Sequence, residues 1–207
     1  MRLLLVRHGE TDWNAEQRFI GRTNLPLSQK GKRQAHALAQ RLTEEHVDVI
    51  YTSDYQRASQ TASIIAESLQ KPVTKDERLR ELDFGRWEGL TMDQIQKSHP
   101  GEFTRWMAEP RTSPPDGESL FQLHARVNSL LNELLSSHQN DTVALVAHGG
   151  TFQILLLIAL DIPLRNGWYF YMYNGALSEL RFHDKNAALV YLNDTHHLGE
   201  SPYGADT

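Results

Sequence analysis

Basic side chains follow three separate apolar stretches of the sequence. LLLV leads into Arg7 and His8, VDVIYTS leads to Arg57, and TVALVA leads into His148. Guanidinium groups bind phosphate oxygens through planar, forked donors. Imidazole groups carry protons and metals, and act as nucleophiles, near neutral pH. These residue types together indicate chemistry on a tetrahedral phosphate.

Two neighbouring features suit the same anion. Gly149 and Gly150 follow His148, so backbone amides at the start of a helix can approach an anion closely there. Asn14 offers a neutral hydrogen-bond donor near His8. We therefore include Asn14 and Gly149 among the candidate phosphate-binding residues.

The segments that carry these residues alternate between strand and helix patterns. Short apolar or β-branched runs predict strands, and apolar residues three and four apart predict helices. The predicted strands are 3–6, 47–53 and 142–147, and the predicted helices are 31–45, 54–69, 118–135 and 152–160. Because ligands of open α/β sheets bind at the carboxyl ends of strands, we expect the two histidines and two arginines to converge there.

The pattern changes after Pro163. Aromatic and alternating residues from Tyr169 to Asp194, interrupted by NG and DKN, predict antiparallel strands at a sheet edge. The predicted fold is α/β, a three-layer α/β/α arrangement with a mixed, mostly parallel central sheet. The run YFYMY at 169–173 is predicted as an edge strand that could pair with a second copy, which leaves a homodimer open.

Composition limits the class of protein. The 207 residues, 40% hydrophobic and 23% charged, suit one soluble domain over 1–207. A formal net charge of −5 argues against a nucleic-acid binder of the usual basic kind. The apolar runs are too short for a signal peptide or a membrane span, so we expect a cytoplasmic protein with no membrane contact. The absence of cysteine excludes disulfides, thiolate metal sites and cysteine nucleophiles.

Four motifs occur in order along the chain: LLLVRHGETDWN, SDYQRASQTA, LRELDFGRWEGL and VAHGG. Together they resemble the histidine phosphatase superfamily, with its phosphoglycerate-mutase-like fold, over about residues 2–198. The resemblance implies that His8 is the nucleophile and is transiently phosphorylated. It also implies that Arg7, Arg57 and a protonated His148 hold the phosphoryl oxygens, with no metal and no cofactor.

The same resemblance assigns the proton donor and its surroundings. Glu81 lies where similar proteins place the residue that protonates the leaving alkoxide and then activates water. Three acidic neighbours are expected to be structural: Glu77, Asp83 and Glu88. Thr23 resembles part of the family's loop near the phosphate. The segment 87–119, which includes Trp106, is expected to form a packed helical cap that selects the leaving group.

The sequence differs from the pattern of phosphoglycerate mutases in two ways. The middle region is shorter than in phosphoglycerate mutases, and Arg80, Glu81 and Leu82 stand where mutases usually have Asn-Glu-Arg. Both departures favour a phosphatase similar to α-ribazole and broad-specificity phosphatases, acting on a small phosphorylated metabolite. Phosphosugars, phosphoserine and nucleotide-like esters remain open as substrates. A mutase and a non-catalytic module that binds phosphorylated ligands remain as alternatives.

Overall fold

Within residues 1–167, 169–184 and 186–199, which the computed structural model describes, six strands form one sheet in the order β3-β2-β4-β1-β5-β6. The strands are β1 (Arg2–Arg7), β2 (Val49–Thr52), β3 (Val73–Lys75), β4 (Thr142–Ala147), β5 (Leu177–His183) and β6 (Asn186–Asp194). β3, β2, β4 and β1 are parallel neighbours in that order. β5 pairs antiparallel with β1 and with β6. The predicted mixed, mostly parallel sheet is confirmed.

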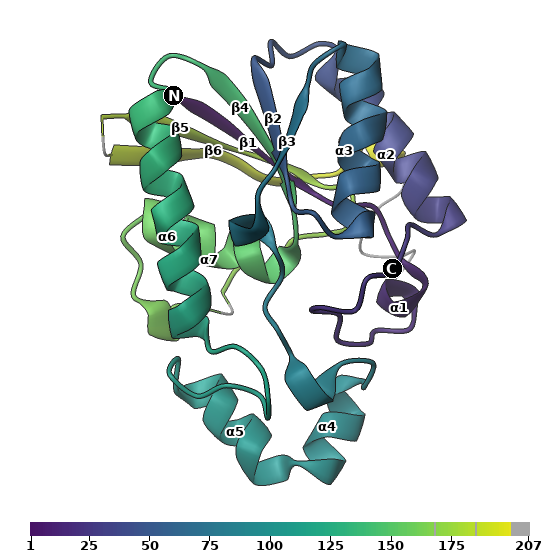
Figure 1. The fold of residues 1–207 in the computed structure, drawn as a ribbon, viewed down its shortest axis with the longest axis vertical. Helices are drawn as coiled ribbons and strands as arrows, with labels where there is room; N and C mark the ends of the chain where they lie inside the picture. The colour runs from purple at the N-terminus through teal and green to yellow at the C-terminus, as the bar shows by residue number, and fades with distance from the viewer. Residues whose placement is uncertain (168, 185, 200–207) are drawn as a thin grey trace.

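Helices cover both faces of this sheet (Figure 1). The helices are α1 (Asp12–Ala15), α2 (Gln29–Leu42), α3 (Gln56–Leu69), α4 (Met92–Ser98), α5 (Pro100–Ala108), α6 (Leu120–Ser137) and α7 (Gly149–Ala159). Short 3-10 turns form at Glu77–Leu79, Gly85–Trp87, Leu164–Asn166 and His196–Leu198. The three-layer α/β/α arrangement expected from the sequence is therefore present.

The alternation of side chains along β1 explains why both faces are covered. Leu3 and Leu5 pack with residues of α6 and α7, whereas Leu4 and Val6 pack with residues of α2 and α3. A strand buried on both faces has no polar side, which is why its sequence is a continuous apolar run. Among the described residues, none of the helices combines the length and hydropathy needed to cross a lipid bilayer.

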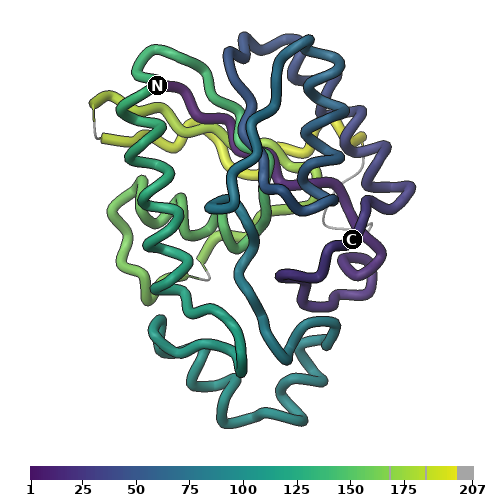
Figure 2. Tube along the Cα trace, viewed as in Figure 1, coloured from purple at the N-terminus to yellow at the C-terminus, as the bar shows by residue number. Residues whose placement is uncertain are grey.

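The segment with α4 and α5 extends away from the sheet at one end of the molecule (Figure 2). Its core is aromatic, with the ring centroids of Trp87 and Trp106 5.3 Å apart. Both indole side chains are buried, together with Phe103 and Ile95. Trp106 is therefore packed inside this helical segment, as expected from the sequence.

The prediction for YFYMY is wrong. Of the described residues 169–173, none lies in a strand. Met172 is buried and its carbonyl oxygen accepts a hydrogen bond from Nη1 of Arg7, while Tyr169 and Tyr171 are exposed. The antiparallel hairpin begins later, at Leu177, and Lys185 of the predicted DKN turn lies outside the described residues. Pairing of YFYMY as an edge strand therefore no longer argues for a homodimer, which stays a prediction.

Candidate active site

Strand register brings the two buried histidines together. β1 and β4 are parallel neighbours, with Arg7 opposite Ala147, so the next residue of each strand, His8 and His148, emerges at the same edge. Their ring centroids are 5.1 Å apart. Both side chains are almost fully buried. The convergence expected at the carboxyl ends of the strands is present.

A backbone contact fixes the ring of His8. Its Nδ1 lies 2.7 Å from the carbonyl oxygen of Gly9. Because a carbonyl oxygen can only accept a hydrogen bond, Nδ1 carries the hydrogen in the neutral ring, and Nε2 keeps its lone pair. Burial, followed by the charges of Arg57 and Arg7, lowers the pKa of His8 well below 6.5. His8 is therefore neutral at pH 7 and is oriented as a nucleophile through Nε2.

His148 has the opposite tautomer. Nε of Arg57 donates to Nδ1 of His148 at 3.1 Å, so Nε2 carries the hydrogen in the neutral ring. That buried Nε2 makes no hydrogen bond to any residue that the structure describes. Burial, followed by the charge of Arg57, lowers the pKa of His148 well below 6.5. These contacts favour a neutral His148 with one N–H to donate, and the protonated form expected beside a phosphoryl group stays a prediction.

Arg57 is held by a loop near the N-terminus. Its Nη1 and Nη2 donate to the carbonyl oxygens of Thr23 and Gly21, each at 2.9 Å. Burial lowers the pKa of Arg57 to about 10, which still leaves the side chain charged at neutral pH. Together with the bond to His148, these contacts fix a cation beside the two histidines.

Arg7 and Asn14 complete the polar wall near His8. Nε of Arg7 is buried and has no hydrogen-bond partner among the described residues. Oδ1 of Asn14 accepts from Thr11 and from Nδ2 of Asn174, which leaves the Asn14 amide group as a donor. Asn174 also donates to the carbonyl oxygen of His8 at 3.2 Å. The sequence showed Asn174 only as the first residue of an NG turn, so its contact with the His8 backbone was missed.

Glu81 lies at the N-terminus of α7. Its carboxylate accepts from the backbone amides of Leu82 at 2.8 Å, Gly150 at 3.0 Å and Thr151 at 3.1 Å. The Gly150 and Thr151 amides belong to the first turn of α7, whose N–H groups have no partner within the helix. The carboxylate is thereby placed close to the glycines that follow His148.

One cavity of about 660 Å³ contains most of the candidate residues. Its lining includes the candidate residues Arg7, His8, Asn14, Glu81 and Gly149, and also the side chains of Phe19, Ile20, Phe84, Met92 and Tyr171. His148 and Arg57 are fully buried next to His8. The cavity therefore combines anion-binding groups with apolar and further polar side chains.

Thr23, which was expected to bind phosphate, contacts Glu88 and Arg57 instead. Within the described part of the chain, it is not among the residues that line the cavity. Its hydroxyl group donates to Oε2 of Glu88, and its backbone amide donates to the same oxygen at 2.8 Å. Thr23 therefore supports Arg57 through its carbonyl oxygen, and Glu88 holds the loop, in agreement with the structural position expected for Glu88.

Comparisons with known proteins cover nearly the whole chain. A family model described as the histidine phosphatase superfamily (branch 1) matches residues 3–195. Phosphoserine phosphatase 1 of Hydrogenobacter thermophilus is 37% identical over 201 residues, which are 97% of this chain and 95% of that protein.

Solved structures also match over nearly the whole chain. A mycobacterial glucosyl-3-phosphoglycerate phosphatase in complex with VO3 matches with a TM-score of 0.87 and 35% identity, over 94% of this chain and 99% of that chain. The α-ribazole phosphatase from Shigella flexneri matches with a TM-score of 0.85 and 28% identity, over 94% of this chain and 96% of that chain. The similar proteins are thus named for three different phosphate esters.

Proposed function

Because the chain belongs to the histidine phosphatase superfamily and is a metal-independent phosphatase, we propose that it hydrolyses a small phosphate monoester through a phosphohistidine at His8. The observation that carries this proposal is the contact between Nδ1 of His8 and the Gly9 carbonyl oxygen. It leaves Nε2 with a free lone pair on a residue that lines the cavity beside Arg7.

The proposed reaction has two steps. In the first, Nε2 of His8 attacks phosphorus, the bond to the ester oxygen breaks, and Glu81 in its protonated form gives its proton to the leaving alkoxide. In the second, the Glu81 carboxylate takes a proton from water, whose oxygen attacks phosphorus and breaks the N–P bond. Inorganic phosphate leaves, and His8 and Glu81 return to their starting forms.

Three groups are placed to stabilise the phosphoryl oxygens in both steps. Arg7 and Arg57 supply positive charge, and Nε2–H of His148 supplies a donor without a partner among the described residues. Donors fixed before the reaction need no reorganisation when charge develops in the transition state. This gives each tautomer a separate task, with His8 attacking and His148 donating.

Trapping the phosphoenzyme tests this function. The wild-type protein, mixed with substrate and stopped with alkali, should carry one acid-labile phosphoryl group that peptide mapping locates at His8. His8→Ala should lose both the adduct and turnover, whereas His124→Ala, on α6, should keep both. Normal turnover by His8→Ala would contradict the proposal.

For the substrate, we propose an ester whose leaving group has a sizeable apolar part, with α-ribazole 5′-phosphate as the leading candidate. The support is the group of aromatic and aliphatic side chains in the cavity lining: Phe19, Ile20, Phe84, Met92 and Tyr171. Burial of an apolar leaving group against such side chains is favourable at about 25 cal/mol per Å². A bicyclic base joined to a sugar phosphate suits a cavity that has both anion-binding groups and apolar side chains.

Phosphoserine is a second candidate, and one specific feature favours it. Arg18 and Asp93 line the same cavity and carry opposite charges. A guanidinium group suits the carboxylate of phosphoserine, and a carboxylate suits its ammonium group. The name of the Hydrogenobacter relative agrees with this alternative.

A substrate panel separates these candidates. We would measure kcat/KM for α-ribazole 5′-phosphate, phosphoserine, glucosyl-3-phosphoglycerate and 3-phosphoglycerate, with EDTA present throughout. A large preference for the ribazole ester supports the first candidate, and a preference for phosphoserine replaces it. Stimulation of 3-phosphoglycerate isomerisation by a bisphosphorylated primer would instead indicate a mutase. Binding of the whole panel without phosphate release would indicate a non-catalytic module.

A further inference from the structure

We propose that Arg126, together with Glu118, is a positioning residue that holds Glu81 in place for proton transfer. The proposal rests on the function above, in which Glu81 is the proton donor. Neither residue stands in the four motifs that identify the family, and neither was a candidate from the sequence. Their position is visible only in the contacts around the Glu81 backbone.

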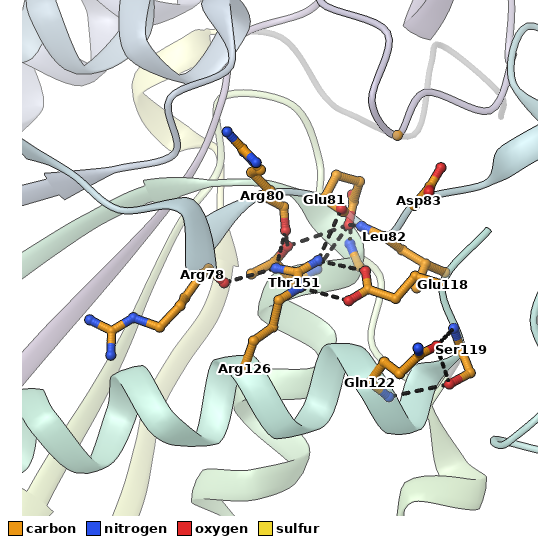
Figure 3. A network of polar contacts seen from close by, with 12 residues as sticks. Arg78, Arg80, Glu81, Leu82, Asp83, Glu118, Ser119, Gln122, Arg126 and Thr151 are labelled. Carbon is orange, nitrogen blue, oxygen red and sulfur yellow. Dashed lines mark hydrogen bonds and ion pairs between the residues drawn. The ribbon is translucent and has the colours of Figure 1, made fainter. Parts of the chain in front are cut away.

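Arg126 uses all five of its guanidinium hydrogens (Figure 3). Nε and Nη2 donate to the two carboxylate oxygens of Glu118, each at 2.8 Å. Nη1 donates to the carbonyl oxygens of Arg78 at 2.8 Å and Arg80 at 2.6 Å, and Nη2 donates to that of Glu81 at 3.0 Å. One side chain thus binds three carbonyl groups of the four-residue segment that ends at Glu81.

Only a guanidinium group can make this set of contacts. Arginine presents five N–H donors in a fixed planar fork, whereas lysine has three donors at a single atom. The Arg126 and Glu118 side chains are 21% and 18% exposed, so water competes only partly for these bonds. A bidentate pair with a carboxylate also fixes the plane of the guanidinium group. Glu118 therefore sets the orientation in which Arg126 meets the three carbonyl groups.

The segment is held on its other side by α7. The hydroxyl group of Thr151 donates to the carbonyl oxygen of Arg80 at 2.8 Å. The amides of Gly150 and Thr151 donate to the Glu81 carboxylate. The main chain at Glu81 is consequently fixed by α6 through Arg126, and its carboxylate is fixed by α7.

Arg126 acts at a distance from the reacting atoms. Glu81 lines two hollows: the cavity that contains His8, and a separate hollow of about 820 Å³ that Arg126 and Glu118 also line. Arg126 contacts the Glu81 carbonyl oxygen, and within the described part of the chain it does not line the cavity that contains His8. Its effect on the reaction must pass through the position of Glu81.

The test compares two esters in Arg126→Lys. An alkyl phosphate needs a proton on its leaving oxygen, whereas p-nitrophenyl phosphate releases a stable phenolate that does not. We expect kcat/KM for the alkyl ester to fall roughly 10- to 100-fold, a part of the 10²–10⁴ that a general acid contributes. We expect kcat/KM for p-nitrophenyl phosphate to stay within about twofold, which also shows that the variant is folded.

Two further variants sharpen this test. Glu118→Gln removes the bidentate partner of Arg126 and should give the same selective loss on the alkyl ester. Arg78→Lys is the matched control, because its side chain forms ion pairs with Asp76 and Glu133 rather than with the Glu81 segment. It should leave both esters unaffected. An equal loss on both esters in Arg126→Lys, or no loss on either, would overturn the proposal.

Amide hydrogen exchange provides a readout that does not depend on activity. The Gly150 and Thr151 amides donate to Glu81 at a helix end, so displacement of Glu81 should speed their exchange in Arg126→Lys but not in Arg78→Lys. Unchanged exchange at both amides would overturn the positioning of Glu81 by Arg126. A wild-type protein that releases no phosphate would contradict the proposed function instead, and the exchange experiment would still decide the positioning.

Discussion

At the scale of single residues, backbone and side-chain partners decide what each buried histidine can do. His8 and His148 have the same side chain and nearly the same burial, and their rings are in contact. Because Nδ1 of His8 faces the Gly9 carbonyl oxygen, the hydrogen of the neutral His8 ring is on Nδ1. Because Nδ1 of His148 accepts a hydrogen bond from Arg57, the hydrogen of the neutral His148 ring is on Nε2. In the proposed reaction, the His8 ring therefore attacks phosphorus and the His148 ring donates a hydrogen bond. Sequence motifs identify both histidines and their partners Gly9 and Arg57, but which ring nitrogen meets each partner depends on the folded geometry.

The contacts of Arg57 predict the effect of a conservative change. Lysine at this position keeps the charge but cannot reach His148, Gly21 and Thr23 together, because it lacks the guanidinium fork. We expect Arg57→Lys to lower kcat/KM roughly 100- to 1000-fold, the usual cost of losing one fixed donor to a transition state. Steady-state kinetics with p-nitrophenyl phosphate would check this. A loss below threefold would show that the charge alone suffices.

At the scale of elements, the close contact between the start of α7 and the Glu81 carboxylate explains why residue 150 is glycine. A Cβ atom there would lie 2.6 Å from Oε1 of Glu81, so the carboxylate would have to move. Gly150→Ala should therefore lower kcat/KM for alkyl esters by about tenfold or more. The stability of the helix should not fall, because alanine is more favourable than glycine in a helix by up to about 1 kcal/mol. Kinetics and thermal unfolding would measure the two effects.

Gly101→Ala is the control for this change, because a Cβ atom at Gly101 has no neighbour within 4 Å. It should leave activity unaltered. If Gly150→Ala retained full activity on alkyl esters, the Glu81 position seen in the ligand-free protein would not be the one that reacts.

The loop before α2 gives a second prediction at this scale. The Glu88 carboxylate accepts from the backbone amides of Arg22 and Thr23, and the Thr23 and Gly21 carbonyl groups hold Arg57. Glu88→Gln places an amide donor against those donors, so we expect the free energy of unfolding to fall by about 1–3 kcal/mol. We also expect kcat/KM to fall about tenfold, which corresponds to 1.4 kcal/mol.

A double mutant tests whether Glu88 acts through Arg57. If it does, Glu88→Gln should add little to the kinetic loss of Arg57→Lys, because the two changes disturb one network. Glu102→Gln, at an exposed position on α5, is the control. Independent, additive losses would contradict the link.

The secondary-structure elements also show which parts of the fold can be predicted from sequence patterns. The buried strands and long helices followed from apolar spacing, because burial on the sheet is what produces that spacing. YFYMY has the composition of a strand, yet the Met172 carbonyl group binds Arg7 instead of a neighbouring strand. Arg126 left a weaker signal: it lies between Leu123 and Val127 on α6, and both of those are buried. A cation at that position of a helix indicates a polar network, but it does not identify the partners.

At the scale of the whole molecule, two buried neutral histidines make stability depend on pH. In the unfolded chain both titrate near 6.5, whereas the folded protein keeps their pKa values well below that. Below pH 6.5 the unfolded state therefore binds more protons, and the free energy of unfolding falls by up to about 1.4 kcal/mol per pH unit for each histidine. Their stabilising contribution is complete above pH 6.5 and is lost as the pH falls.

Urea unfolding at a series of pH values measures this dependence. His148→Gln should flatten the slope below pH 6.5, whereas His36→Gln, at an exposed position on α2, serves as the control for a histidine outside the site. Equal slopes in the wild type and His148→Gln would show that folding does not shift the pKa of His148. In that case His148 would gain its proton at the same pH in the folded protein as in the unfolded chain.

The Gly9 contact also predicts the regiochemistry of the proposed phosphohistidine intermediate. Phosphohistidine exists as two isomers, and a ring whose Nδ1 is engaged with a carbonyl group can form only the one with phosphorus on the distal nitrogen. Antibodies or NMR methods that distinguish the isomers should therefore detect a single species in the trapped enzyme. If the proposed phosphoenzyme forms, its chemical identity is thus set by a contact that exists before any substrate binds.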